Sequence, residues 1–447
     1  MSKEPMFRFS YTRIITAGFA ALILCGGVLL SLPISSRTGE WTNLLDAIFT
    51  ATSTTCVTGL IIYDTYTHWS VFGQLVLLTL IQIGGIGFMT IITMFSLFFK
   101  RKIGLHERQL LVQATGMMEL GGAVRLIKRI VKMSLAIEAI GVVLLAIRFC
   151  PQMGFKTGLY NAVFHSVSAF CNAGFDLMGK YGAFSSLTGY SGDVVVCMTI
   201  AALIAIGGIG FVVWNDVWTH RLHFRQYGLH AKIVLVVTGI LIAGGAVLFF
   251  LFEYDGAFAG MDLVERINSA IFQSVSPRTA GFNSVDLTGL TEASIFLTII
   301  LMFIGGSSGS TAGGIKTTSL FILVVNAQNT ARKTHSMVAF KRRLGDDTIK
   351  RAGAIVTIYA FAVAAATLIL CTMEPVSFRD ALFETVSAIG TVGLTLGITP
   401  TFGATAKIVI IILMFAGRVG WITFLLSLSG KHNDPPVERP VEKIMVG

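Results

Sequence analysis

The chain is organised by one short phrase, which reads DALFETVSAIGTVGL over residues 380–394. Three related phrases precede it: DAIFTATSTTCVTGL at 46–60, NAVFHSVSAFCNAGF at 161–175 and SAIFQSVSPRTAGF at 269–282. Each copy contains a phenylalanine, then a serine, and then a glycine next to its end. The third copy is one residue shorter between the serine and the glycine. Self-similarity of this kind predicts one object built from four equivalent parts.

The composition indicates which solvent these parts occupy. Hydrophobic residues make up 54% of the 447 residues, charged residues only 13%, and the mean hydropathy is +0.76. A soluble domain of this size could not cover so much apolar surface with polar groups. The sequence therefore predicts an all-α polytopic membrane protein.

Each phrase lies between two apolar stretches, and about 20 helical residues are needed to cross a bilayer. The predicted pairs are 12–33 and 71–99, 126–149 and 194–214, 233–252 and 295–325, and 352–373 and 408–428. The phrases are too short to cross and return as two helices. We therefore expect four M1-P-M2 repeats, in which a first helix (M1) and a second helix (M2) flank a re-entrant pore loop (P). This gives eight transmembrane helices and four pore loops in a pseudo-fourfold arrangement. The irregular backbone of the loops would be buried in protein or line water.

The repeats divide the chain at its basic connections. Repeat 1 covers residues 1–102, repeat 2 covers 103–225, repeat 3 covers 226–333, and repeat 4 with a cytoplasmic tail covers 334–447. Lys and Arg gather in these connections, which predicts that the connections and both termini are cytoplasmic. The net charge of +10 then needs no nucleic acid, because the basic loops would lie beside anionic membrane lipids. The stretch 104–132 is long enough for an amphipathic helix on the membrane surface.

The residues that close the four phrases are uncharged. They form four triplets: Val57, Thr58 and Gly59; Asn172, Ala173 and Gly174; Thr279, Ala280 and Gly281; and Thr391, Val392 and Gly393. Without a ring of charged side chains, the remaining ion ligand is the backbone carbonyl, which can replace water around a monovalent cation. One such glycine alone would more often end a helix or allow close packing. Four in register predict an ion filter.

At these residues the chain resembles the Trk/Ktr/HKT superfamily of potassium transporters, and most of all its bacterial KtrB members. Thr391-Val392-Gly393 is similar to the filter of potassium channels, and 276–282 is similar to the third loop of the family. Gly59 stands where sodium-preferring plant relatives have serine, which implies potassium (K+) at the filter. The resemblance also implies a homodimer in the bacterial plasma membrane, a cytosolic ring of KtrA-like RCK subunits that binds ATP or ADP, and activation by sodium (Na+). It implies no cofactor in this chain.

The second apolar stretch of each repeat carries a glycine motif. It reads IGGIGF at 83–88 and 206–211, IGGSSGSTAGG at 304–314, and AGRVGW at 416–421, so that Arg418 stands where Gly85 stands in the first repeat. A charge at membrane depth must face water or the bundle interior. Arg418 either opposes cation passage below the filter or binds carbonyls of a broken helix, and the sequence leaves both interpretations open. Glu138 is a second intramembrane charge, to which the sequence assigns no role.

The glycine run of the third repeat predicts a broken helix. Residues 305–314 contain five glycines, and each costs about 1 kcal/mol relative to alanine in a helix. In the family that the chain resembles, this segment is the intramembrane gating loop. The predicted gating residues are Gly305, Gly306, Ser307, Ser308, Gly309, Ser310, Thr311, Gly313, Gly314, Lys316 and Arg418.

Two other classes of protein fit the sequence less well. A coupled secondary transporter would have inverted repeats and ionisable ligands at the membrane midplane, whereas each repeat here starts at a basic connection and the triplets hold no acid. A membrane enzyme is disfavoured because His68, His165 and His220 are scattered along the chain without metal-ligand spacing. The six cysteines show no paired spacing and are interpreted as packing residues. No nucleotide-binding motif is present, so we expect ions to move down their gradient.

Overall fold

The computed structural model describes residues 11–87, 90, 123–221, 223–333, 338–428 and 442. In this part of the chain the only strands are β1 (Val338–Ala339) and β2 (Arg342–Arg343), which pair antiparallel between the helices Thr317–Ala331 and Asp346–Met373. Most of the predicted amphipathic stretch 104–132, the boundary between repeats 1 and 2, and most of the carboxyl-terminal tail lie outside the described residues.

The same order of elements recurs four times along the chain. The first helices are α1 (Tyr11–Ser31), α7 (Ala123–Met153), α11 (Leu229–Phe252) and α15 (Asp346–Met373). The short helices are α2 (Leu44–Thr55), α8 (Phe155–Phe170), α12 (Leu263–Val275) and α16 (Phe378–Gly390). The second helices are α4 (Val71–Ile86), α9 (Val194–Ile209) with α10 (Phe211–His220), α13 (Glu292–Phe303) with α14 (Thr317–Ala331), and α17 (Ala404–Val419) with α18 (Trp421–Leu428).

Short elements join these helices. They are α3 (Thr65–His68) and the 3-10 turns η1 (Pro33–Ser35), η2 (Met178–Lys180), η3 (Thr188–Tyr190), η4 (Phe224–Gln226), η5 (Leu287–Gly289) and η6 (Thr399–Thr401). Side chains define where several helices begin. Asn43 caps α2 by accepting from the Leu45 amide at 2.9 Å, and Ser377 caps α16 by accepting from the Asp380 amide at 3.1 Å.

The four first helices, within 12–31, 127–153, 229–252 and 346–373, are long and apolar enough to cross a membrane. The pairs α9 with α10 and α17 with α18 bring the number to six if each bent pair is one span. The chain is therefore a polytopic all-α membrane protein, as its composition predicts. Among the described residues, the second apolar stretches of the second, third and fourth repeats are each divided into two helices and are not continuous.

Helices α4, α9 and α17 end at the same position of the glycine motif, whereas α13 ends before its motif begins. The sequence predicts a break only in the third repeat, but α9 and α10 meet at 96° and α17 and α18 at 104°. Gly210 and Gly420 stand at those bends with φ of 106° and 92°, and Gly87 at the end of α4 has φ of 96°. Glycine reaches this left-handed conformation without a steric cost, and the helix ends there.

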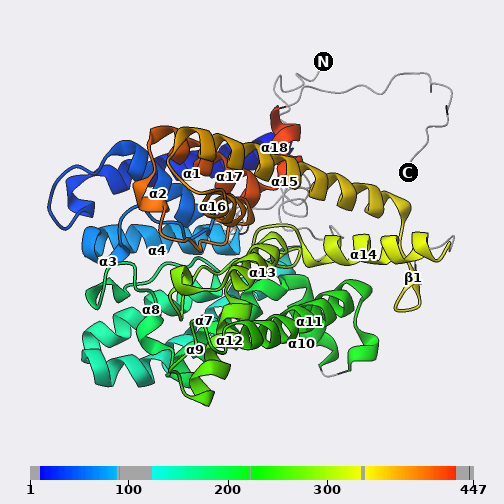
Figure 1. Ribbon diagram of the computed structural model, residues 1–447, viewed down its shortest axis with the longest axis horizontal. Helices are drawn as coiled ribbons and strands as arrows, with labels where there is room; N and C mark the ends of the chain where they lie inside the picture. Colours follow the sequence, from blue (N-terminus) through cyan, green and yellow to red (C-terminus); the bar gives the residue numbers. More distant parts are fainter. Residues whose placement is uncertain are drawn as a thin grey trace.

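The four units close into a ring. The second helix of each unit packs against the short helix of the next: α4 against α8, α9 against α12, α13 against α16, and α17 against α2. Helices α1 and α18, from opposite ends of the chain, also lie side by side (Figure 1). The phrase phenylalanines Phe49, Phe164, Phe272 and Phe383 are all fully buried. Close packing of this kind holds helices together in a membrane.

A polar contact joins every pair of neighbouring units. The contacts are Phe184 N to Asp64 Oδ2 at 3.0 Å, Asn268 Nδ2 to the Ser191 carbonyl at 2.6 Å, Arg379 to Glu292 at 2.6 Å, and Lys407 to Asp46 at 2.6 Å.

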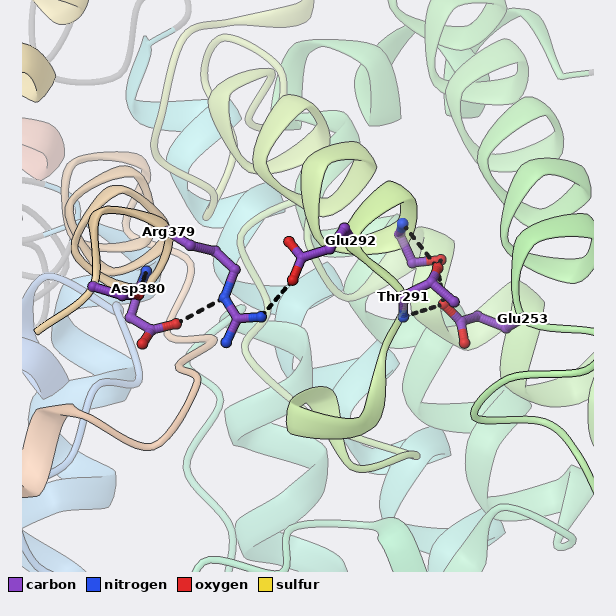
Figure 2. Close-up of polar contacts among 7 residues, drawn as sticks. Glu253, Thr291, Glu292, Arg379 and Asp380 are labelled. Atoms are coloured by element: carbon purple, nitrogen blue, oxygen red, sulfur yellow. Dashed lines mark hydrogen bonds and ion pairs between the residues drawn. The ribbon is translucent and has the colours of Figure 1, made fainter.

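The contact between the third and fourth units holds the start of α13 (Figure 2). Arg379 binds Glu292 at 2.6 Å and Asp380 at 3.0 Å. On the other side, the buried Glu253 carboxylate accepts hydrogen bonds from the Thr291 amide at 2.9 Å and hydroxyl at 2.7 Å. The exposed ion pair contributes about 0–1 kcal/mol, so Glu253 is the stronger anchor.

The contact between the fourth and first units is a buried ion pair. The side chains of Lys407 and Asp46 are 14% and 9% exposed, and the Tyr63 hydroxyl donates to the second Asp46 oxygen at 2.7 Å. Asp46 lies in the first turn of α2, before the first triplet, and Tyr63 lies after that triplet. The ion pair and the Tyr63 hydrogen bond together therefore connect both sides of the first triplet to the fourth unit.

We expect Lys407→Met to lower the free energy of unfolding by about 3–5 kcal/mol, because it leaves the Asp46 carboxylate buried without its cation. Thermal unfolding of the purified protein in detergent measures this. Adding Asp46→Asn to that variant removes the unpaired charge and should restore most of the loss. A double variant as unstable as the single one would show that the charge is not responsible.

Candidate functional site

The four triplets share an unusual backbone. Their first residues have positive φ: 57° at Val57, 60° at Asn172, 70° at Thr279 and 51° at Thr391. The glycines also have positive φ, of 99° at Gly59, 72° at Gly174, 78° at Gly281 and 92° at Gly393, whereas the middle residues do not. Left-handed β-branched residues are rare and persist only where their surroundings hold them.

The serine of each phrase holds the triplet in place. The serine carbonyl accepts a hydrogen bond from the backbone amide of the middle triplet residue. These bonds run from Thr58 to Ser53 at 2.7 Å, from Ala173 to Ser168 at 2.8 Å, from Ala280 to Ser276 at 2.9 Å, and from Val392 to Ser387 at 2.8 Å. The Ser53 hydroxyl also accepts a hydrogen bond from the Gly59 amide at 3.0 Å, and the Ser387 hydroxyl accepts one from the Gly393 amide at 3.1 Å. The sequence shows the repeated serine but not this role.

The four glycines meet in a closed ring, in chain order. A β-carbon built on each glycine would lie too close to a carbonyl oxygen of the next unit. The distance is 2.7 Å from Gly59 to Ala173, 2.7 Å from Gly174 to Ala280, and 2.5 Å from Gly281 to Val392. One on Gly393 would overlap the Thr58 carbonyl oxygen and lie 2.8 Å from the Gly59 Cα. Real β-carbons do not approach backbone atoms so closely, so each position requires glycine. The ring presents uncharged carbonyl oxygens from all four units.

The glycines of the second helices serve a different purpose. A β-carbon on Gly84, Gly207 or Gly417 would overlap the carbonyl oxygen of Thr55, Phe170 or Ile389, respectively. These carbonyls lie at the ends of the short helices that precede the triplets. The first glycine of the motif thus lets each of these second helices pack directly beneath the ring, which is a structural role.

A loop joins α13 to α14 and contains the glycine run of the third repeat. Its two ends pair through a parallel bridge between Ile304 and Ile315. The loop also binds the broken second helix of unit 2, where the Ser307 amide donates to the Gly208 carbonyl at 3.0 Å and the Phe211 amide donates to the Gly309 carbonyl at 2.8 Å. Those two bonds lie on either side of the bend at Gly210.

Two cations hold the loop. The Arg418 guanidinium donates to the carbonyls of Thr311 in the loop and of Gly84 and Gly85 at the end of α4, with 3.3 Å to Gly85. The Lys316 ammonium donates to the carbonyls of Ala312 at 2.9 Å and Gly313 at 3.2 Å. Arg418 therefore binds broken-helix carbonyls, one of the two roles that the sequence left open.

A cavity of about 280 Å³ adjoins the loop. Its lining includes Arg418 and Lys316, loop residues such as Ser308 and Gly314, and Gly420 at the bend between α17 and α18. Arg418 therefore lines the cavity in addition to binding the carbonyls of the loop and of α4. The structure brings the predicted filter and gating residues together in one region of the molecule.

Glu138 has a partner that the sequence does not reveal. Its side chain in α7 is 4% exposed, and Gln82 Nε2 in α4 donates to both carboxylate oxygens at 3.0 and 3.1 Å. The Cys171 thiol, next to the second triplet, donates to Gln82 Oε1 at 3.6 Å. The charge therefore faces the bundle interior. The signal in the sequence is a polar Gln82 in an apolar helix, two residues before Gly84.

Comparison with known proteins places these features in a family. Residues 14–438 match the TrkH family, described as cation transport protein. The potassium/sodium uptake protein NtpJ of Enterococcus hirae is 41% identical, over 100% of this chain and 99% of that protein. The Ktr system potassium uptake protein B of Bacillus subtilis is 39% identical, over 98% of this chain and 97% of that protein.

A solved structure has the same fold. The crystal structure of the potassium transporter TrkH from Vibrio parahaemolyticus superposes with a TM-score of 0.76 and covers 96% of this chain and 86% of that one. The two sequences are 16% identical, so this likeness concerns the fold alone.

Proposed function

The chain belongs to the TrkH family of cation transport proteins, and from this we propose that it takes up potassium ions through the ring of Gly59, Gly174, Gly281 and Gly393. The observation that carries the proposal is the closed ring of uncharged backbone oxygens. Such a ring can replace the hydration shell of a monovalent cation. The relatives named for potassium uptake and for potassium/sodium uptake support this choice of ion.

The short helices favour a cation at this ring. Helices α2, α8, α12 and α16 all end within a few residues of a triplet, and the carboxyl end of a helix carries a partial negative charge. No triplet residue carries a charge of its own. The proposed site therefore attracts cations without binding them so strongly that they cannot leave.

The proposed path continues from the ring into the cavity. Residues 305–314, with Lys316, form the gate, and Arg418 holds this gate closed while its charge opposes cations in the cavity. The four units correspond to residues 1–102, 103–225, 226–333 and 334–447, each with an M1-P-M2 order, and the basic connections and both termini face the cytoplasm of a bacterium.

Regulation is proposed to come from outside the chain. We infer a homodimer bound to a cytosolic ring of KtrA-like RCK subunits that senses ATP or ADP, with sodium as an activator. The relatives named as components of a Ktr system support a second component. Membrane lipids are the other partners that we expect.

Potassium uptake in cells that lack their own potassium uptake systems tests the function, with and without sodium. We expect uptake that follows the electrochemical gradient, and sodium should raise its rate without moving in fixed proportion to potassium. No uptake would contradict the proposal, and a fixed ratio of sodium or protons to potassium would indicate a coupled transporter instead.

We expect Gly59→Ser to reduce the preference for potassium over sodium. The serine β-carbon would lie 2.7 Å from the Ala173 carbonyl oxygen at a φ of 99°, which displaces an oxygen of the ring. Strain of about 1–3 kcal/mol corresponds to roughly a 5- to 150-fold change in the uptake ratio. Competition between labelled rubidium and sodium measures it, and an unaltered ratio would remove Gly59 from the filter.

A further inference from the structure

The loop below the ring touches the ring itself. Among the first residues of the four triplets, only Asn172 has an amide side chain, and it is 1% exposed. Its Oδ1 lies 3.2 Å from the Thr311 hydroxyl in the loop, and its Nδ2 lies 3.5 Å from the Thr279 hydroxyl in the third triplet. One side chain therefore connects two triplets with the loop.

Thr311 is the corresponding residue of the loop, and it is fully buried. Its single hydroxyl proton is shared between Asn172 Oδ1 and the Phe170 carbonyl, at 3.2 and 3.3 Å. Its amide donates to the Gly207 carbonyl at 3.4 Å, and its own carbonyl accepts from Arg418. The atoms of Thr311 thus contact the ring on one side and the cation that holds the loop on the other.

A second contact reaches the opposite side of the ring. A β-carbon on Gly313 would overlap the hydroxyl oxygen of Thr391, the first residue of the fourth triplet. Thr391 Oγ1 has no hydrogen-bond partner among the described residues. Because the units follow one another around the ring, the second and fourth triplets face each other. The loop of the third unit therefore lies against two opposite triplets.

We propose that the Thr311–Asn172 hydrogen bond couples the position of the loop to the ion selectivity of the ring. This inference rests on the proposed function of both segments. When the loop withdraws, Asn172 loses this partner and the second triplet is no longer held from below, so the oxygen cage widens or shifts. Coupling free energies are reciprocal. Occupancy of the ring by potassium should therefore favour the loop position in which the bond is made.

The test measures the potassium-to-sodium flux ratio of the full chain in liposomes. Thr311→Val removes the hydroxyl and keeps the carbonyl that binds Arg418. Asn172→Gly removes the amide and keeps the positive φ, so it serves as a second, independent variant. We expect each to lower the ratio roughly 3- to 10-fold, the effect of one hydrogen bond. The double variant should show no larger loss than Asn172→Gly alone, because that variant already lacks the Thr311 bond, and Thr311→Ser should keep the wild-type ratio.

Thr318→Val is the matched control. It removes a hydroxyl whose partner is Ser308 Oγ, at 3.3 Å, and not a triplet residue, so it should leave the ratio unchanged. The inference is overturned if Thr311→Val changes total flux but not the ratio, if the losses of the two single variants add in the double variant, or if Thr318→Val lowers the ratio as much. A wild-type protein that carries no potassium would instead refute the proposed function, and this inference with it.

Discussion

Replacing Gly393 with alanine should abolish selective potassium uptake. A β-carbon there would overlap the Thr58 carbonyl oxygen and lie 2.8 Å from the Gly59 Cα. Both neighbours are backbone atoms of the first unit, so no side-chain rotation can relieve the overlap. Lys407 and Asp46 hold these two units together, so they cannot separate freely. We expect uptake to fall roughly 100-fold, equivalent to about 2.8 kcal/mol, when measured as rubidium flux in liposomes.

Gly397→Ala is the matched control for this variant. Gly397 lies four residues further along and also has a φ of 92°, but a β-carbon there would have no atom within 4 Å. The two variants therefore carry a similar backbone strain and differ in the overlap. We expect Gly397→Ala to fold and to retain uptake. Equal uptake in the two variants would show that the ring does not conduct the ion.

Arg418→Ala should open an unregulated leak. The guanidinium joins the Thr311 carbonyl of the loop to two carbonyls at the end of α4, and the variant removes all three bonds together with the charge that lines the cavity. A hydrogen bond to a charged group contributes about 1.5–3 kcal/mol. We therefore expect flux without regulatory subunits to rise at least roughly 10-fold, measured in liposomes that contain this chain alone.

Two further variants separate the roles of Arg418. Arg418→Lys keeps the charge but loses the planar fork that reaches several carbonyls at once, so we expect it to leak as well. A lysine variant that stays closed would assign the effect to charge repulsion. Deletion of residues 305–314 should also raise the flux. Unchanged or lower flux in both the deletion and Arg418→Ala would exclude the gating role.

The local features of the fold could be predicted from the sequence. The repeated phrase predicts four equivalent units, and the apolar stretches predict the first helices closely: residues 12–33 correspond to α1, Tyr11–Ser31. The polar glycine run predicts the loop between α13 and α14. Each of these depends on residues near one another in the chain, where composition and helix propensity act.

The breaks at Gly87, Gly210 and Gly420 could have been anticipated but were not. All three occupy one position of a motif that the sequence displays, yet a glycine there fits a packed helix as well as a bend. The chemical nature of the residue permits positive φ without requiring it. Packing against the neighbouring unit decides between the two.

The sequence by itself determined that the chain enters a membrane, that it consists of four like units, and that each unit contributes an uncharged triplet ending in glycine. Only the tertiary structure decided that each glycine lies against a carbonyl of the next unit, that Arg418 binds Thr311 and Gly84, and that Asn172 meets Thr311. All of these contacts join different units. The residues joined by the three hydrogen bonds are between 107 and 334 positions apart in the sequence. Contacts at such separation arise from how whole helices pack, and no spacing along the chain encodes them.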